Sequence, residues 1–441
     1  MKPLIVLFLI LLPFVSHAET VDLTQALNDA IKRRPMALAA RDEARAANSG
    51  AIEARSRLLP NISLTEKALR TDEPGGSLFI SLNQEDLQLS NSASAYNYPP
   101  ARTDFETRVT LQQSLYDPDA WFGLKRAEAD ARTADAMARW TDDEAAFAAF
   151  RAYLGVQQAQ AAEAWAEAAR REAQENLRLA EQRRAAGLGL KAEALQAQVA
   201  LAEAERNQFT TNNDIILARR SLALAMGRPE LEVEIAAPLK AALFAPTRMD
   251  GSMQRADLEA LASRAEAASL AHRQSRADWL PRASLAASYA LHDGDTPFGG
   301  EAGAWSLQAG LQWELFDGLR RQGASARTAA QTRAARNHAL EANRQSQFAL
   351  EQARRRAEEA QLKLSSARRA VVQASESRRL TLQRYEAGLS PLVDLLTAQT
   401  LLDRTRYAEL NAETGHILAL GDILFQQGRF LTLLTDKENQ P

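Results

Sequence analysis

The 441-residue chain contains no cysteine, which excludes disulfides, thiolate metal sites, catalytic thiols and a lipid-modified N-terminal cysteine. Its five histidines show no spacing typical of metal ligands. The sequence patterns of nucleotide-binding loops, dinucleotide-binding folds, serine hydrolases and zinc proteases are absent as well. We therefore expect no enzyme activity, no metal site and no cofactor.

An excess of one charge is also missing. The 53 basic and 56 acidic residues give a formal net charge of −3 at pH 7, which offers no case for nucleic-acid binding. Beyond the first residues, no apolar run approaches the roughly 18 to 20 residues that a transmembrane helix requires. The sequence therefore predicts no helical membrane anchor.

Residues 1–18 are typical of a secretory signal peptide. Lys2 supplies the positive end, Leu4 to Val15 the apolar stretch, and Ser16-His17-Ala18 a cleavage site of small residues. We expect the mature, exported chain to begin near Glu19.

Proline and glycine are almost absent from two long stretches. Leu124 to Ala186 contains only Gly155, and Ala324 to Ala387 contains neither residue type. Alanine, glutamate, arginine and glutamine dominate both stretches, and these are strong helix formers. A helix over the first stretch is about 100 Å long at 1.5 Å per residue. Because large apolar side chains are sparse, we expect narrow, coiled-coil-like packing seams.

The two halves of the chain repeat each other. Gly187 and Gly227 recur 201 positions later as Gly388 and Gly428. The repeated glycines mark turns and ends of helices, so each long helix is expected to return as an antiparallel hairpin. Upstream, two further motifs recur in the same order, namely Leu59-Pro60 as Leu280-Pro281 and Leu115-Tyr116-Asp117 as Leu315-Phe316-Asp317. One structural unit has been used twice.

We therefore divide the chain into a signal peptide (1–18), a first repeat (19–228), a linker (229–253), a second repeat (254–429) and a C-terminal tail (430–441). Each repeat is expected to contain an entry helix, a strand, a polar loop, a second strand, a long helix, a turn and a return helix.

Residues 305–315 alternate between apolar and polar or small residues, which is the pattern of a strand with two unlike faces. Similar patterns predict strands near 62–68, 105–115 and 285–291, with polar loops at 70–102 and 293–303. In an exported protein such strands favour a membrane barrel with lipid outside and water inside; the alternative is an ordinary half-buried sheet. Five aromatic residues are then candidates for the lipid boundary, namely Phe105, Tyr116, Trp305, Trp313 and Phe316.

Four strands do not close a barrel, since the smallest known barrels have about eight. An open sheet edge in hydrocarbon leaves unpaired backbone groups, each costing several kcal/mol. We therefore expect several chains to share one barrel.

Taken together, these motifs resemble those of the TolC-like outer membrane factor family, the exit ducts of bacterial efflux pumps and type I secretion systems. The resemblance covers nearly the whole mature chain and rests on the two Leu-Pro pairs, on Asp117 and Asp317, and on the turns around Gly187 and Gly388. It implies a mostly helical fold with a membrane β-barrel, in which a homotrimer builds one twelve-stranded barrel in outer membrane lipid and an α-helical tunnel through the periplasm. It also implies two partners, a periplasmic adaptor (membrane fusion) protein and an inner-membrane pump of RND, ABC or MFS type.

The resemblance also implies roles for residues at the tunnel tips. The turns that hold Gly187, Leu188, Gly388 and Leu389 correspond to the adaptor-contacting tips. Both glycines are equally compatible with a purely structural role as turn residues.

Three further residues correspond to the family's gate and constriction. Tyr385 matches the gate tyrosine, Glu193 its acidic partner, and Asp394 one carboxylate of the constriction ring. The gate arginine is replaced by Ser390, for which Arg384 is a possible substitute. Alternatively, Tyr385 is a packing aromatic and Asp394 only favours the positive end of its helix.

Two rival functions remain open at this point. A periplasmic coiled-coil adaptor or scaffold also uses long helical hairpins, but it does not need four alternating strands. A substrate-specific porin fits poorly, because most of the chain is predicted to be helical. The cargo, whether drug, metal ion or protein, is not encoded in any recognisable tract.

Overall fold

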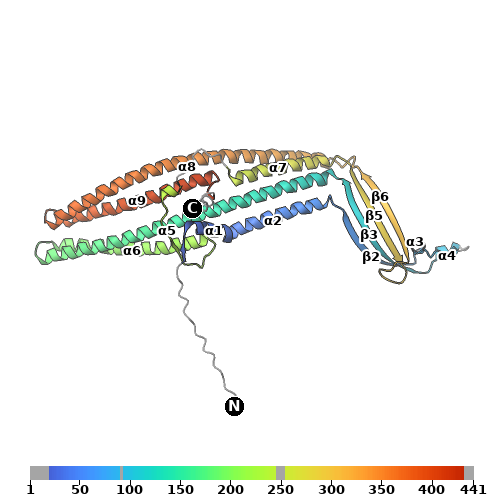
Figure 1. Cartoon of the computed structure of the whole chain (residues 1–441), viewed down its shortest axis with the longest axis horizontal. Helices are drawn as coiled ribbons and strands as arrows, with labels where there is room; N and C mark the ends of the chain where they lie inside the picture. Colours follow the sequence, from blue (N-terminus) through green and yellow to red (C-terminus); the bar gives the residue numbers. More distant parts are fainter. Residues whose placement is uncertain (1–18, 90–92, 245–253, 432–441) are drawn as a thin grey trace, which may run out of the picture. The chain divides into compact units, whose positions relative to one another are not determined.

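A computed structural model describes residues 19–89, 93–244 and 254–431 (Figure 1). The predicted signal peptide, most of the linker's second half and almost all of the C-terminal tail lie outside these residues. The chain divides into two compact units. Unit 1 is drawn from Met1–Glu43, Ala136–Leu258 and Glu341–Pro441, and unit 2 from Ala44–Asp135 and Glu259–Leu340.

Unit 2 contains the four predicted strands. They are β2 (Asn61–Thr71), β3 (Arg102–Tyr116), β5 (Arg282–Asp293) and β6 (Ala302–Gln312). The strands form one antiparallel sheet in the order β2-β3-β5-β6, with a bulge in β3 near its end (Figure 1). Strands β2 and β6 are therefore the edges of the sheet within this chain.

The two faces of the sheet differ in chemistry, as the alternation predicts. Leu64, Val109, Tyr289 and Trp305 lie opposite one another across the four strands, and all four side chains are exposed. One position away along the strands, a row of Ser and Thr side chains occupies the other face and comprises Ser63, Thr110, Ser288 and Ser306. The chain thus builds an apolar sheet face that none of its described residues covers.

The segment between β2 and β3, expected to be a loop, contains helix α3 (Pro74–Asn83) and the short helix α4 (Ala93–Asn97). Pro74 occupies the first turn, where its missing N–H costs nothing. Helix α3 packs against β3 and β6, and Ile80 is buried there. His292, the penultimate residue of β5, is buried, and its Nδ1 lies 2.9 Å from the Asp104 carboxylate.

Two very long helices belong to both units. They are α5 (Pro118–Ala185, 68 residues) and α8 (Arg320–Glu386, 67 residues). Each follows a strand through an aspartate that accepts a hydrogen bond from a backbone N–H of the first turn. Asp117 accepts from Ala120 and Asp317 from Arg321. None of the described helices has an apolar stretch long enough to cross a bilayer.

Unit 1 contains the return helices α6 (Lys191–Ala225) and α9 (Leu392–Gln426) and the helix α1 (Leu23–Arg33). A short parallel pair of strands, β1 (Glu19–Val21) and β4 (Val233–Ile235), lies beside them, with a 3₁₀ turn at Ala241–Phe244. The entry helices α2 (Pro35–Ser56) and α7 (Ala256–Ala277) complete the fold.

The core of unit 1 joins the two repeats through aromatic rings. Phe147 of α5 stacks on Phe425 of α9 with 4.5 Å between ring centroids, and Phe150 lies buried against Phe430. Gly421 makes this approach possible, since a Cβ there lies 2.4 Å from Phe150.

The four repeated glycines all have positive φ, between 68° and 77°. Their surroundings differ: a Cβ on Gly187 meets nothing within 4 Å, whereas one on Gly227 lies 2.7 Å from the carbonyl carbon of Arg33. Gly428 is as crowded, because a Cβ there lies 2.6 Å from the carbonyl oxygen of Gln254. The first repeated pair (Gly187, Gly388) therefore only turns the chain, and the second pair (Gly227, Gly428) also packs against backbone.

We predict that Gly227→Ala destabilises the protein much more than Gly187→Ala. Both substitutions force a left-handed backbone on alanine, which costs about 1–2 kcal/mol. Only Gly227→Ala adds a clash with backbone atoms that cannot rotate away. Denaturation followed by circular dichroism in detergent measures the difference, and equal losses for the two variants would contradict the packing role.

Candidate functional site

The hairpin turns of the two repeats have the same hydrogen bonds. Leu188 N–H donates to the Arg183 carbonyl at 2.9 Å, and Leu389 N–H donates to the Arg384 carbonyl at 2.8 Å. Each helix therefore ends in a Schellman-type turn with its glycine in the left-handed region. The leucines that follow are 73% and 71% exposed, so each turn presents an apolar side chain to its surroundings, and the first turn adds Leu190.

Arg183, in the last turn of α5, binds the end of α8. Its Nη1 donates to the carbonyl oxygens of Tyr385 at 2.8 Å and Glu386 at 3.3 Å. Its guanidinium also lies over the Tyr385 ring, 4.8 Å from the centroid. A cation at the negative end of a helix, bonded to carbonyls that have no intrahelical donor, stabilises that helix end.

Glu193, in the first turn of α6, makes the opposite contact. Its carboxylate accepts from the N–H of Leu190 at 3.2 Å and, across the hairpins, from the N–H of Leu392 at 3.4 Å. Leu392 is the first residue of α9, so an acidic group lies at the positive end of that helix. Arg183 and Glu193 of the first repeat thus bind both helix ends of the second hairpin.

Tyr385 is fully buried between these contacts, with 0% of its surface exposed. Its hydroxyl has no hydrogen-bond partner among the described residues. Burial and the nearby Glu193 carboxylate raise the pKa of Tyr385, and Arg183 opposes this. The two predicted gate residues therefore belong to one cluster, although Glu193 bonds to backbone N–H groups and not to the tyrosine.

The other predicted tip residues are differently placed. Asp394 and Arg384 are exposed, and neither side chain bonds to any described residue of the chain. Ser390, at the position of the missing arginine, has a buried hydroxyl without a described partner. Sequence reasoning missed Arg183, although Arg384 lies 201 positions after it and carries the same charge.

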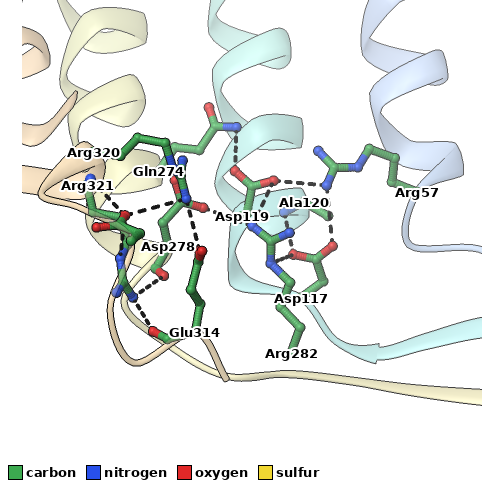
Figure 2. Close-up of polar contacts among 11 residues, drawn as sticks. Arg57, Asp117, Asp119, Ala120, Gln274, Asp278, Arg282, Glu314, Arg320 and Arg321 are labelled. Atoms are coloured by element: carbon green, nitrogen blue, oxygen red, sulfur yellow. Dashed lines mark hydrogen bonds and ion pairs between the residues drawn. The ribbon is translucent and has the colours of Figure 1, made fainter. Parts of the chain in front are cut away.

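A second polar cluster lies in unit 2, where strands continue into long helices (Figure 2). Arg57 bonds to Asp119 at 2.9 Å and reaches Asp117 at 3.4 Å, while Gln274 donates to Asp119 at 2.9 Å. Burial alone raises the pKa of Asp119, but hydrogen bonds from Gln274 and Arg57 outweigh it and lower that pKa. Arg282, which bonds to Asp278 at 2.8 Å, lies within 4 Å of Asp117 as well.

The equivalent junction of the second repeat is built around Arg321, which is 1% exposed. Its guanidinium donates to Asp317 at 2.9 Å and to the carbonyl oxygens of Glu314 at 2.7 Å and Asp278 at 3.2 Å (Figure 2). It also lies over the ring of Trp279, 4.4 Å from the centroid. Burial favours a higher pKa for Asp317, but hydrogen bonds from the Arg321 backbone and guanidinium lower it.

The candidate boundary aromatics are mostly exposed. Trp305 lies on β6, and Trp313 and Phe316 follow its last residue, because that strand begins and ends three residues earlier than predicted. The Trp313 indole N–H donates to the Trp279 carbonyl at 3.1 Å. Phe105 and Tyr116 lie on β3, with Tyr116 exposed at its last position and Phe105 half-buried near its first.

Within the residues that the structure describes, no group of three or more His, Asp or Glu side chains lies close enough to hold a metal ion. The two clusters join helix ends and strand ends, and neither presents a nucleophile beside a base. The two clusters therefore fix the ends of the long helices, one at the hairpin turns and one at the junctions with the strands.

Comparison with known proteins decides the family. The model of the outer membrane efflux protein family matches residues 26–228 and 252–419, which is most of the chain. The chain belongs to this family. The predicted resemblance to TolC-like outer membrane factors is thereby confirmed.

Among curated proteins, the alkaline protease secretion protein AprF of Pseudomonas aeruginosa is 28% identical over 193 residues. That match covers 42% of this chain and 40% of AprF, so it spans about two fifths of the relative's length.

Solved structures show the same fold along almost the whole chain. A membrane protein from Pseudomonas aeruginosa superposes with a TM-score of 0.79 at 18% identity, covering 93% of this chain and 94% of the other. The outer membrane protein VceC from Vibrio cholerae gives 0.77 at 19% identity, covering 92% and 96%. At these identities the likeness concerns the fold, which confirms the predicted class of four strands with long helical hairpins in a TolC-like arrangement.

Proposed function

We propose that this chain is the outer membrane exit duct of a tripartite efflux or type I secretion system, and that it is not an enzyme. Three chains share one twelve-stranded barrel, and their hairpins continue it as a periplasmic tunnel. The exported chain loses residues 1–18 before it reaches the outer membrane.

The observation that carries this proposal is the uncovered apolar face of a four-stranded sheet with two open edges. Leu64, Val109, Tyr289 and Trp305 are exposed in a row across all four strands. Lipid covers such a face at no cost, and pairing of β2 with the β6 of a second copy satisfies both edges. The exposed Tyr116, Trp313 and Phe316 lie where β3 and β6 lead into the long helices, and they fit the lipid boundary on that side.

The hairpin turns are proposed as the docking and closing end of the duct. Exposed Leu188 and Leu389 offer apolar contacts to a periplasmic adaptor, which couples the duct to an inner-membrane pump. Arg183, Glu193 and Tyr385 hold the two hairpins of one chain together and form part of the closed state. In a trimer, three Asp394 carboxylates form a ring that attracts cations.

Cell fractionation and planar bilayers test the proposal together. We expect the protein in the outer membrane fraction, extracted only by detergent, and we expect the purified trimer to form ion-conducting channels. Recovery in the soluble periplasmic fraction, with no conductance, would instead indicate the rival function of a coiled-coil adaptor or scaffold.

Asp394→Ala is predicted to reduce the cation selectivity of those channels. The substitution removes all three ring charges while leaving the buried core of the tip unchanged, because Asp394 is exposed and bonds to no described residue. Reversal potentials in a salt gradient measure the change. Asp214→Ala, an exposed site on α6 away from the turn, is the matched control, and equal selectivity in both variants would remove Asp394 from the ring.

A further inference from the structure

One pair of charged side chains joins the two hairpins within this chain, although the repeat contains an equivalent pair in each half. Arg183 and Glu193 of the first hairpin bind the second hairpin. Their equivalents 201 positions later, Arg384 and Asp394, have the same charges, are exposed, and bond to no described residue. The second hairpin therefore presents an unused copy of the binding pair.

The first hairpin presents the equivalent acceptors and donor, and no side chain among the described residues bonds to them. The groups that Arg183 and Glu193 bind are the carbonyls of Tyr385 and Glu386 and the N–H of Leu392. Their equivalents in the first repeat are the carbonyls of Arg184 and Ala185 and the N–H of Lys191, all on exposed residues. The carbonyls lie at the negative end of α5, which a cation stabilises. The N–H lies at the positive end of α6, which an anion stabilises.

We propose that Arg384 and Asp394 of one chain bind the first hairpin of the neighbouring chain, Arg384 through the carbonyls of Arg184 and Ala185, and Asp394 through the N–H of Lys191. The partner is thus a second copy of this chain. The proposal rests on the homotrimer of the proposed function and assigns the residues that join its tips. It also places the three Asp394 carboxylates at the seams between chains.

The two kinds of seam are chemically unequal. Within a chain, Arg183 lies over the ring of the buried Tyr385. Between chains, Arg184 occupies the position of that tyrosine, so Arg384 faces a second guanidinium in place of an aromatic ring. The contact between chains loses the cation–π attraction and gains a like-charge repulsion. The contacts between chains are therefore the weaker contacts of the closed tip.

Cross-linking tests this directly, because the natural chain has no cysteine and every product involves the introduced residues. The test variant carries Ala185→Cys and Arg384→Cys. The matched control carries Arg183→Cys and Glu386→Cys, whose positions have the same relation within one chain. Purified trimers are treated with a short bismaleimide and separated under denaturing conditions.

We expect the control variant to run as a monomer with an internal link, and the test variant to shift to covalent dimers and closed trimers. A test variant that stays monomeric while the control reacts, in protein that light scattering shows to be trimeric, overturns the proposed seam but leaves the duct intact. Protein that is monomeric in detergent and does not conduct overturns the proposed function itself.

Conductance provides a second measurement that introduces no cysteine. We expect Arg384→Ala to raise the resting conductance in bilayers several-fold, because it removes the proposed hydrogen bonds between chains. Arg184→Tyr supplies the missing ring and is expected to lower the conductance. Two variants that both behave like the natural protein overturn the proposal.

Discussion

Replacing Arg183 with alanine is expected to convert a mostly closed duct into a leaky one. The side chain bonds to two carbonyl oxygens at the end of α8 and lies over Tyr385. Charge-assisted hydrogen bonds of this kind contribute about 2 kcal/mol, which corresponds to about a thirtyfold shift between closed and open tips. The measurements are single-channel conductance in planar bilayers and the sensitivity of producing cells to a bulky antibiotic that the outer membrane normally excludes.

Two variants separate this role from a general loss of charge. Arg178→Ala removes the same side chain five residues earlier on α5, where among the described residues it pairs only with Glu175 on its own helix. Such exposed pairs contribute little, so we expect no added leak. Arg183→Lys keeps the charge but loses the planar, multiply donating guanidinium and should be intermediate. If Arg183→Ala and Arg178→Ala leak equally, Arg183 is not part of the closed state.

Much of the fold was accessible from the sequence because the repeat makes weak signals specific. A single Ala-Gly-Leu turn predicts little, but Gly187 and Gly388 at the same position in both copies fix the ends of two hairpins. The alternation along β6 likewise predicted a sheet with two unlike faces, and the strand register confirms them. Periodicity and turn chemistry are local properties, and they are what a single sequence encodes most directly.

Helix α3 was not predicted, for a physical reason. Its sequence begins Pro-Gly-Gly-Ser and lies in a segment rich in turn residues, so local preference favours a loop. The helix forms where Ile80 and Ser77 are buried beside the sheet. Tertiary packing therefore outweighs propensity here, and no local pattern reports it.

The cluster of Arg183, Glu193 and Tyr385 at the hairpin turns was likewise only partly predicted from the sequence. The resemblance directed attention to Tyr385, Glu193 and Ser390, and it missed Arg183 because the bond from Arg183 to the carbonyl of Tyr385 depends on which hairpins are neighbours. A hydrogen bond between residues 202 positions apart has no signature in a single sequence. The repeat did contain a usable sign, since Arg183 recurs as Arg384.

Replacing Arg321 with methionine is expected to destabilise the junction between β6 and α8. Methionine keeps much of the volume but removes the donors to Asp317 and to the carbonyls of Glu314 and Asp278. Because Arg321 is almost completely buried, its three acceptors then lose a charged donor, and Asp317 keeps only the backbone N–H of residue 321 and a 3.6 Å contact with Arg320. We expect the Tm of the detergent-solubilised trimer to fall by roughly 5–10 °C.

The neighbouring Arg320→Met is the matched control. Arg320 is exposed, pairs with Glu314 at 3.1 Å and reaches Asp317 only at 3.6 Å, so its loss should lower the Tm by no more than about 2 °C. The double variant Asp317→Asn with Arg321→Met should recover part of the loss, because it removes the carboxylate that the missing arginine leaves unpaired.

The pH dependence provides a further check on the Arg321 prediction. Because Arg321 lowers the pKa of Asp317, this pair contributes stability above the ordinary carboxyl pKa and loses it as the pH falls through the lowered value. The difference in Tm between the natural protein and Arg321→Met should therefore be largest near pH 7 and should become smaller below about pH 4. A difference that stays constant through this range would mean that the arginine acts through its carbonyl hydrogen bonds and its packing over Trp279, and not through the carboxylate.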